Sequence, residues 1–189
     1  INKFLEKYPN SLNTVDANFI KAECLFKQGK FPEAKKEYTA FIKNFPSSTL
    51  TDDSYFRIGE TFYKSNEFNN AIPAFKELLE RYPESDLSGE AAYWIGESNL
   101  KISEYDDAIK FYKLSYENYP SNKLANYALY SVGWTYQKQN KPKQAIESYE
   151  DFLKKFPNDE LSPAVNVRIG ECYYSMNDFD RALKELNNI

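Results

Sequence analysis

Apolar residues recur along this chain at the three- and four-residue spacing of amphipathic helices, in short segments separated by polar turns. Residues 47–83 contain two such segments. Their apolar positions are Tyr55, Ile58, Phe62, Ala71, Phe75 and Leu78. Asn66 lies between the segments, where the end of a helix needs a left-handed residue, and asparagine tolerates that conformation. Pro83 ends the second segment, because proline cannot continue a helix. The unit is therefore predicted to be a hairpin of two helices with one apolar face left for a neighbour to cover.

The same unit recurs every 37 residues. An aromatic residue followed by proline ends each copy: Tyr8-Pro9, Phe45-Pro46, Tyr82-Pro83, Tyr119-Pro120 and Phe156-Pro157. Alanine holds a second register position: Ala34, Ala71, Ala108, Ala145 and Ala182. A small residue holds a third: Ala22, Gly59, Gly96, Gly133 and Gly170. The chain is therefore predicted to be a single solenoid over residues 1–189, in which each repeat contacts only its neighbours.

This register sets the expected boundaries. The repeats are 10–46, 47–83, 84–120, 121–157 and an incomplete 158–189, after the end of a preceding repeat at 1–9. First helices are predicted over 14–28, 52–65, 89–102, 125–139 and 163–176. Second helices are predicted over 31–44, 69–81, 105–118, 142–155 and 179–188, with residues 1–7 a helical remnant. We expect the natural chain to be longer, because both ends stop within a repeat. Thr51 and Ser162 are expected to cap the first helices that they precede.

The glycine position lies inside the first helix, where glycine costs roughly 1 kcal/mol relative to alanine. Four of the six glycines in the chain occupy it. We therefore predict close packing between the two helices of each hairpin, which a side chain would block.

These residues resemble the tetratricopeptide repeat family over essentially the whole chain. The small residue of the family's first helix matches Gly59, Gly96, Gly133 and Gly170, and its turn residue matches Gly29, Asn66, Asn140 and Asn177. The alanine and aromatic residue of its second helix match Ala71 with Phe75 and Ala108 with Tyr112. The family unit has about 34 residues, and three more follow the proline here, as in residues 83–88. That link resembles bacterial cell-envelope members such as the periplasmic coordinator of the Tol–Pal system and the lipoprotein of the β-barrel assembly machine.

The resemblance implies an all-α fold: a right-handed α-solenoid superhelix of stacked helix-turn-helix hairpins. It also implies a periplasmic or otherwise extracytoplasmic location, with the cytoplasm left open. Cys24 and Cys172 hold the same register position four repeats apart, too far apart for an intrachain disulfide. We interpret them as two small buried thiols.

Composition argues against an enzyme. The chain has no histidine, the commonest general base and metal ligand. Its cysteines lie outside any metal-spaced cluster, and no phosphate-binding glycine motif occurs. We therefore expect no catalytic residues, metal or cofactor. The net charge of −4, with lysine and glutamate interleaved, gives little support for nucleic-acid binding. No stretch is long and apolar enough for a membrane span.

A second set of residues, beginning with Phe56, lies two positions before Ile58 and its equivalents in the first helices. Two residues correspond to about 200° on a helix, so this set lies on the side opposite Ile58. In the family this side lines a concave groove that holds a partner's extended peptide or helix. The candidate groove residues are Phe19, Phe26, Phe56, Glu60, Tyr63, Lys64, Tyr93, Glu97, Tyr130, Trp134 and Tyr174. The alternative is that these rings fill the space between adjacent first helices.

Charged residues flank this candidate groove. Glutamate precedes lysine by four residues in three repeats, an order that favours ion pairs on a helix surface. The pairs are Glu23–Lys27, Glu60–Lys64 and Glu97–Lys101. The family's carboxylate clamp is absent, which disfavours capture of an acidic C-terminal tail.

We predict a non-enzymatic scaffold that binds a protein or peptide partner in the concave groove, with a role in bacterial envelope assembly or maintenance by resemblance. One alternative is a passive or self-assembling solenoid that associates end to end. Its exposed apolar ends would be Ile1, Phe4, Leu5, Leu183, Leu186 and Ile189. Another is a glycan-binding envelope module, since aromatic faces also stack on sugars.

Overall fold

The structure, a computed structural model, describes residues 3, 7, 11 and 13–187, and within these it contains helices and no strand. The first helices of the repeats are α2 (Thr14–Lys27), α4 (Thr51–Lys64), α6 (Ser88–Lys101), α8 (Ala125–Lys138) and α10 (Ser162–Ser175). The second helices are α3 (Phe31–Asn44), α5 (Phe68–Arg81), α7 (Tyr105–Asn118), α9 (Pro142–Lys155) and α11 (Phe179–Asn187). Every bound lies within one residue of its prediction, so the all-α hairpin prediction is confirmed. The predicted remnant over 1–7, with Ile1, Phe4 and Leu5, and the residue Ile189 fall outside the described residues.

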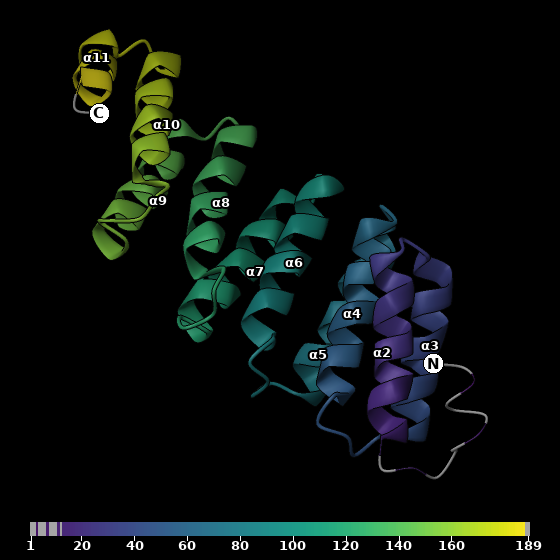
Figure 1. Cartoon of the computed structure of the whole chain (residues 1–189). Coiled ribbons are helices and arrows are strands. Elements are labelled where there is room, and N and C mark those ends of the chain that lie inside the picture. The colour runs from purple at the N-terminus through teal and green to yellow at the C-terminus, as the bar shows by residue number, and fades with distance from the viewer. Residues whose placement is uncertain (1–2, 4–6, 8–10, 12, 188–189) are drawn as a thin grey trace.

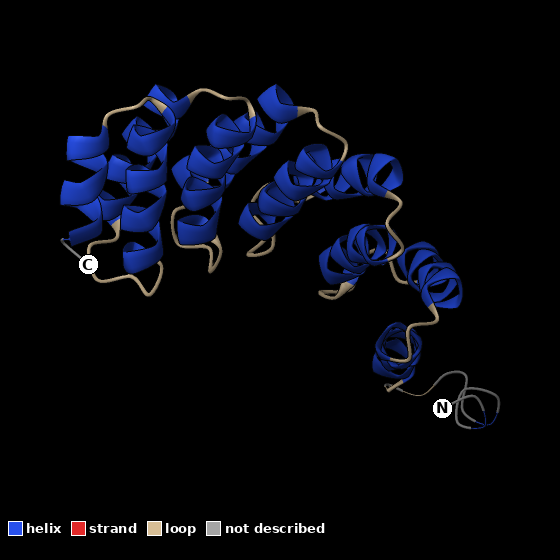
Figure 2. Ribbon diagram, turned by 90° about the horizontal axis from the view of Figure 1, so that it is seen from above, coloured by secondary structure: helices blue, strands red, loops and turns tan. Residues whose placement is uncertain are grey.

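The hairpins stack side by side into an arc (Figure 1). Each helix packs on the next in the chain, and first helices of neighbouring repeats also approach one another, α4 beside α6 and α6 beside α8. The first helices therefore lie on the shorter, inner side of the arc, and the second helices form its outer side (Figure 2). None of the described helices is long and apolar enough to cross a membrane.

Each hairpin turns on one residue with a positive φ. Asn66, Asn140 and Asn177 have φ of 60°, 57° and 61°, and Gly29 has 73°. The amide after the left-handed residue donates to the carbonyl five residues earlier, as Glu67 N does to Phe62 O over 2.9 Å. This bond satisfies a carbonyl at the end of the first helix. The turn prediction is confirmed, and Ser103, with φ of 65°, fills the same position in the third repeat without a sequence signal.

The starts of α4, α6 and α10 are each tied to the preceding repeat by a hydroxyl group. Thr51 Oγ1 donates to Phe45 O over 2.9 Å. Ser88 and Ser162 do the same to Tyr82 O and Phe156 O over 2.8 and 3.2 Å. The prediction that Thr51 and Ser162 cap their helices is wrong: the N-cap residues are leucines, which make no side-chain cap bond. The hydroxyls instead satisfy the last carbonyls of the preceding second helix.

The glycine column brings the two helices of a hairpin into contact. A Cβ atom built on Gly59, Gly96 or Gly133 would lie 2.5, 2.6 and 2.5 Å from the ring of the facing second-helix residue. Those rings, Phe75, Tyr112 and Tyr149, are fully buried. The predicted packing role of these glycines is therefore confirmed.

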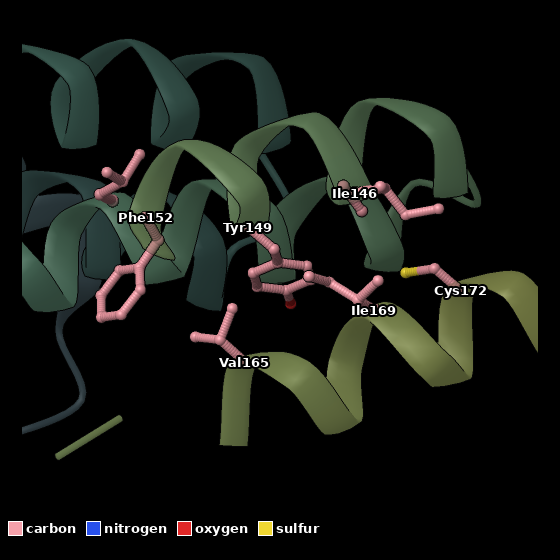
Figure 3. Packing of buried hydrophobic residues seen from close by; sticks show 8 residues of the cluster. Ile146, Tyr149, Phe152, Val165, Ile169 and Cys172 are labelled. Carbon is pink, nitrogen blue, oxygen red and sulfur yellow. The ribbon is translucent and has the colours of Figure 1, made fainter. Parts of the chain in front are cut away.

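The core continues from one repeat into the next through the same rings. Figure 3 shows Tyr149 of α9 directed toward Val165 and Ile169 of α10, which belong to one buried cluster with it. Cys172, in the same cluster, is buried as predicted. The prediction for Cys24 is wrong, because no described residue covers that side of α2 and the thiol is exposed.

Candidate partner-binding surface

The inner side of the first helices carries a row of rings, here called the floor: Phe19, Phe56, Tyr93 and Tyr130. Each floor ring contacts the buried ring of the second helix in its own repeat. The pairs and their centroid distances are Phe19–Tyr38 (5.9 Å), Phe56–Phe75 (5.5 Å), Tyr93–Tyr112 (5.7 Å) and Tyr130–Tyr149 (5.8 Å). The floor therefore closes the first four hairpins from the inner side.

Phe56 is buried, with 5% of its surface exposed, and it joins the core cluster that contains Phe75 and Ile95. Its assignment as a groove residue is therefore wrong: the ring points between the helices and packs edge-on against Phe75. Phe19, Tyr93 and Tyr130 are half-buried, so only part of each ring can meet a ligand.

Seven residues further along lies a second row, here called the rim: Phe26, Tyr63 and Tyr174. Each rim ring packs edge-on against the first residue of the second helix that follows it. The contacts are Phe26–Phe31 (5.6 Å), Tyr63–Phe68 (5.3 Å) and Tyr174–Phe179 (5.5 Å). Tyr63 is also in contact with Trp94 of the next repeat, at 4.8 Å, and is half-buried. No described residue of a following repeat contacts Tyr174 as Trp94 contacts Tyr63, and Tyr174 is 67% exposed.

Two tryptophans lie beside these rows, and both are half-buried. Trp134 lies where other repeats have glutamate, and its ring is held between the charged groups of Lys138 and Arg168, each 4.5 Å from the ring centroid. Trp94 lies beside Tyr63, Glu60 and Lys64 at a shallow recess.

Sequence reasoning missed Trp94. Its register position is held by unlike residues: Ile20, Arg57, Trp94, Ser131 and Arg168. Such variation is the signal that could have found it, because a position that does not fill the core can differ from repeat to repeat.

The glutamates of the inner side are paired within the protein. The hydroxyl of Tyr38 donates to Glu23 Oε1 over 2.5 Å. Arg57 bridges two repeats, with its guanidinium 2.8 Å from Glu23 and 2.5 Å from Glu60. In the fourth repeat, where Trp134 replaces glutamate, Tyr149 donates to Gln137 Oε1 over 2.6 Å. The expected ion pairs of Glu23, Glu60 and Glu97 with Lys27, Lys64 and Lys101 do not form, because tyrosine hydroxyls and Arg57 take the carboxylates instead.

Glu97 forms the most enclosed of these arrangements. Tyr112 donates to its Oε1 over 2.7 Å, and Tyr63 and Tyr93 lie against the same carboxylate. Burial, followed by the charge of Glu97, raises the pKa of Tyr63 to about 12. The same causes hold the pKa values of Tyr93 and Tyr112 far above the usual range. Glu97 is therefore part of the scaffold, and its carboxylate is occupied.

These tyrosines predict an alkaline limit to stability. A raised folded pKa means that the folded state favours the neutral phenol, so stability is full below the unfolded pKa of about 10 and falls as the pH rises above it. The free energy of unfolding should fall there by up to about 1.4 kcal/mol per pH unit for each tyrosine that stays neutral in the folded state, and by less for Tyr63, which solvent partly screens. Tyrosinate absorbance and circular dichroism should change together, and Tyr63→Phe with Tyr93→Phe should reduce the slope. Free titration near pH 10 with intact helicity would contradict this.

Comparison with known proteins gives one family. Two family models, each described as tetratricopeptide repeat, match residues 56–123 in one case and 16–48 and 127–159 in the other, so together they cover most of the chain. None of the curated protein sequences matches.

Solved structures give the same fold. A MamA protein is 23% identical with a TM-score of 0.74, and the match covers 93% of this chain and 89% of that one. MamA 41-end from Desulfovibrio magneticus RS-1 is 16% identical (TM-score 0.72, 92% of each chain), and BtubC from P. vanneervenii is 13% identical (TM-score 0.73, 93% of this chain and 78% of that one).

Proposed function

The chain belongs to the tetratricopeptide repeat family, and from that premise we propose that it is a scaffold that holds a segment of a partner protein against the inner side of its first helices. Repeats of this family generally bind proteins and are generally not enzymes. Trp134 is the observation that carries the proposal. Its indole belongs to none of the buried core clusters of the described residues, yet two cations hold it on the inner side.

Half-exposed tryptophans are suited to this task. A partner can cover them without any loss of core packing, and aromatic anchors supply a large share of binding energy. Trp94 and Trp134 lie in consecutive repeats, so one bound segment could contact both. We propose that the protein is located in the cell envelope. The reason is the longer link between its repeats, such as residues 83–88, which resembles the link of envelope members of the family.

The test is comparative capture from extracts of the source organism, with envelope and cytosol fractions kept apart. We expect a protein that the parent retains to be lost with Trp94→Ala and Trp134→Ala together. A matched change on the outer side, Glu77→Ala with Glu147→Ala, should leave its capture unchanged. Equal loss in both variants, or in neither, would contradict the inner side as the binding surface.

Self-association is a second candidate, favoured by a groove between α10 and α11. The groove has a volume of about 480 Å³ and is lined almost entirely by apolar surface; its residues include Gly170, Tyr174, Phe179, Leu183 and Leu186. Of these, Phe179, Leu183 and Leu186 are 51%, 61% and 44% exposed. In earlier repeats the first helix of the next repeat covers the same positions, as α6 covers α5.

We propose that two copies of the segment 1–189 pair through this groove. Head-to-tail stacking onto α2 is disfavoured, because Lys21 stands where α4, α6, α8 and α10 carry isoleucine or valine. Sedimentation should therefore show a concentration-dependent dimer that Leu183→Glu abolishes. Ile20→Glu, at a residue 49% exposed on α2, should not affect it. A strict monomer at high concentration would contradict the pairing.

A further inference from the structure

The outer side of the solenoid carries a pocket between α7 and α9, with α8 at its base. The first helices α6 and α8 approach one another, whereas α7 and α9 lie further apart on the outer side of the arc. The pocket has a volume of about 200 Å³, and its lining includes Lys113, Leu129, Val132, Gln144 and Ser148. Sites for small molecules are typically about 300 Å³ or larger. This pocket is therefore suited to a single side chain.

The equivalent place one repeat earlier, between α5 and α7, is filled by the protein's own Phe111. This ring is buried, with 9% of its surface exposed, and it belongs to one core cluster with Ile95 of α6. The ammonium groups of Lys76 and Lys110 lie 5.0 and 5.6 Å from its centroid. An apolar base edged by charged groups therefore holds a ring in this groove.

In α9, Ser148 holds the register position of that ring and is too small to fill the space, which leaves the pocket open. The base is equivalent, because Val132 of α8 holds the position of Ile95. One cation is equivalent as well, because Lys113 holds the position of Lys76. With the residues that the structure describes, Lys113 forms no ion pair, hydrogen bond or contact with a ring face. The pocket therefore retains the base and a cation of an aromatic site but lacks the ring.

We propose that this pocket is a second interaction site, which takes an aromatic side chain of a protein partner on the outer side. The partner's ring would lie on Val132, with the ammonium group of Lys113 over its face, an arrangement that favours an aromatic ring over an aliphatic side chain. Glu147 replaces Lys110 here, so one cation remains where Phe111 has two. The site lies on the side of the solenoid opposite the candidate groove and therefore goes beyond the proposed function.

The test is methyl NMR on the whole chain, with N-acetyl-phenylalanine amide as the probe. A bound aromatic ring shifts the signals of nearby methyl groups, so the probe should shift those of Leu129 and Val132, which line the pocket. The cyclohexylalanine analogue, which has no aromatic face, should compete about two- to fivefold more weakly. Lys113→Met should weaken binding of the phenylalanine probe by a similar factor. Lys76→Met, the matched change one repeat earlier, should leave it unchanged.

Ser148→Phe supplies the missing ring from the chain itself. It should shift the methyl signals of Leu129 and Val132 without the probe, and it should abolish binding of the probe. Ser148→Ala keeps the pocket open and should bind the probe as the parent does. Ser148→Leu should also block the probe, which keeps the test independent of whether the phenylalanine variant folds. A probe that leaves both methyl signals of the parent unchanged, or that still binds to the filled variants, would overturn the proposal.

The partner itself is tested in cells of the source organism with a photoreactive residue at Gln144, which is exposed and lines the pocket. We expect a protein adduct that persists with Ser148→Ala, and with Trp94→Ala and Trp134→Ala together, but is lost with Ser148→Phe. No adduct, or an adduct that Ser148→Phe leaves unchanged, would overturn the partner at this site. Loss of the adduct in the double tryptophan variant would also overturn it, because the adduct would then depend on the inner side.

Discussion

Replacing Gly96 with leucine should destabilise the solenoid by about 3 kcal/mol or more, the upper end of what overpacking costs. A Cβ atom at this position would already lie 2.6 Å from the ring of Tyr112. That ring is fully buried and hydrogen-bonded to Glu97, so it has no space into which to move. The whole hairpin would have to open. Loss of helicity in urea measures the change.

Gly170 provides the matched control, because it holds the same register position in the fifth repeat. Its added Cβ would lie 3.1 Å from Leu186, a side chain that is 44% exposed and free to move aside. Gly170→Ala should therefore be close to neutral, since alanine regains about 1 kcal/mol of helix propensity. If Gly96→Ala and Gly170→Ala had equal effects, the glycine column would not be the contact described.

Replacing Trp94 and Trp134 together with alanine should weaken binding of the captured partner at least about a hundredfold, because two aromatic anchors of roughly 2 kcal/mol each are removed. Both rings are half-buried, and Trp134 belongs to none of the core clusters of the described residues. Trp94 packs against the cluster that contains Phe75, so the melting temperature should fall, but by less than with Phe56→Ala. Titration calorimetry and thermal melting on the same samples separate the two effects.

Phe56→Ala should show the opposite pattern. Its ring is 5% exposed and packs on Phe75, so truncation should cost about 3–5 kcal/mol of stability. Binding would then fail only as the protein unfolds. Unchanged stability of Phe56→Ala, or strong destabilisation of the double tryptophan variant, would reverse the assignment of these rings.

The helices could be predicted to within one residue because the signals that end them are local. The proline after Tyr82 and the left-handed Asn66 act within a few residues of the helix ends that they set. Because the unit recurs every 37 residues, each of these signals could also be checked at the equivalent position of the other repeats. The glycine contact was predictable for the same reason, since only a packing constraint explains an unfavourable residue kept at one register position.

The contacts of individual side chains were less predictable, because they depend on the neighbouring repeat. Sequence spacing pairs Glu60 with Lys64, but Arg57 lies closer and also reaches Glu23 in the preceding repeat. Thr51 looked like a cap, yet its hydroxyl meets a carbonyl six residues earlier. Phe56 and Tyr93 share a register position, yet one is buried and the other half-buried. Such differences arise from the shapes of the facing side chains, and a register position in the sequence carries no information about those shapes.

Photo-cross-linking in cells of the source organism can show whether a partner lies on the inner side of the first helices. A photoreactive residue is placed at Lys64, on the inner side, or at Glu77, exposed on the second helix of the same repeat. We expect a discrete protein adduct from position 64 and none from position 77. An adduct from position 77 alone would contradict this.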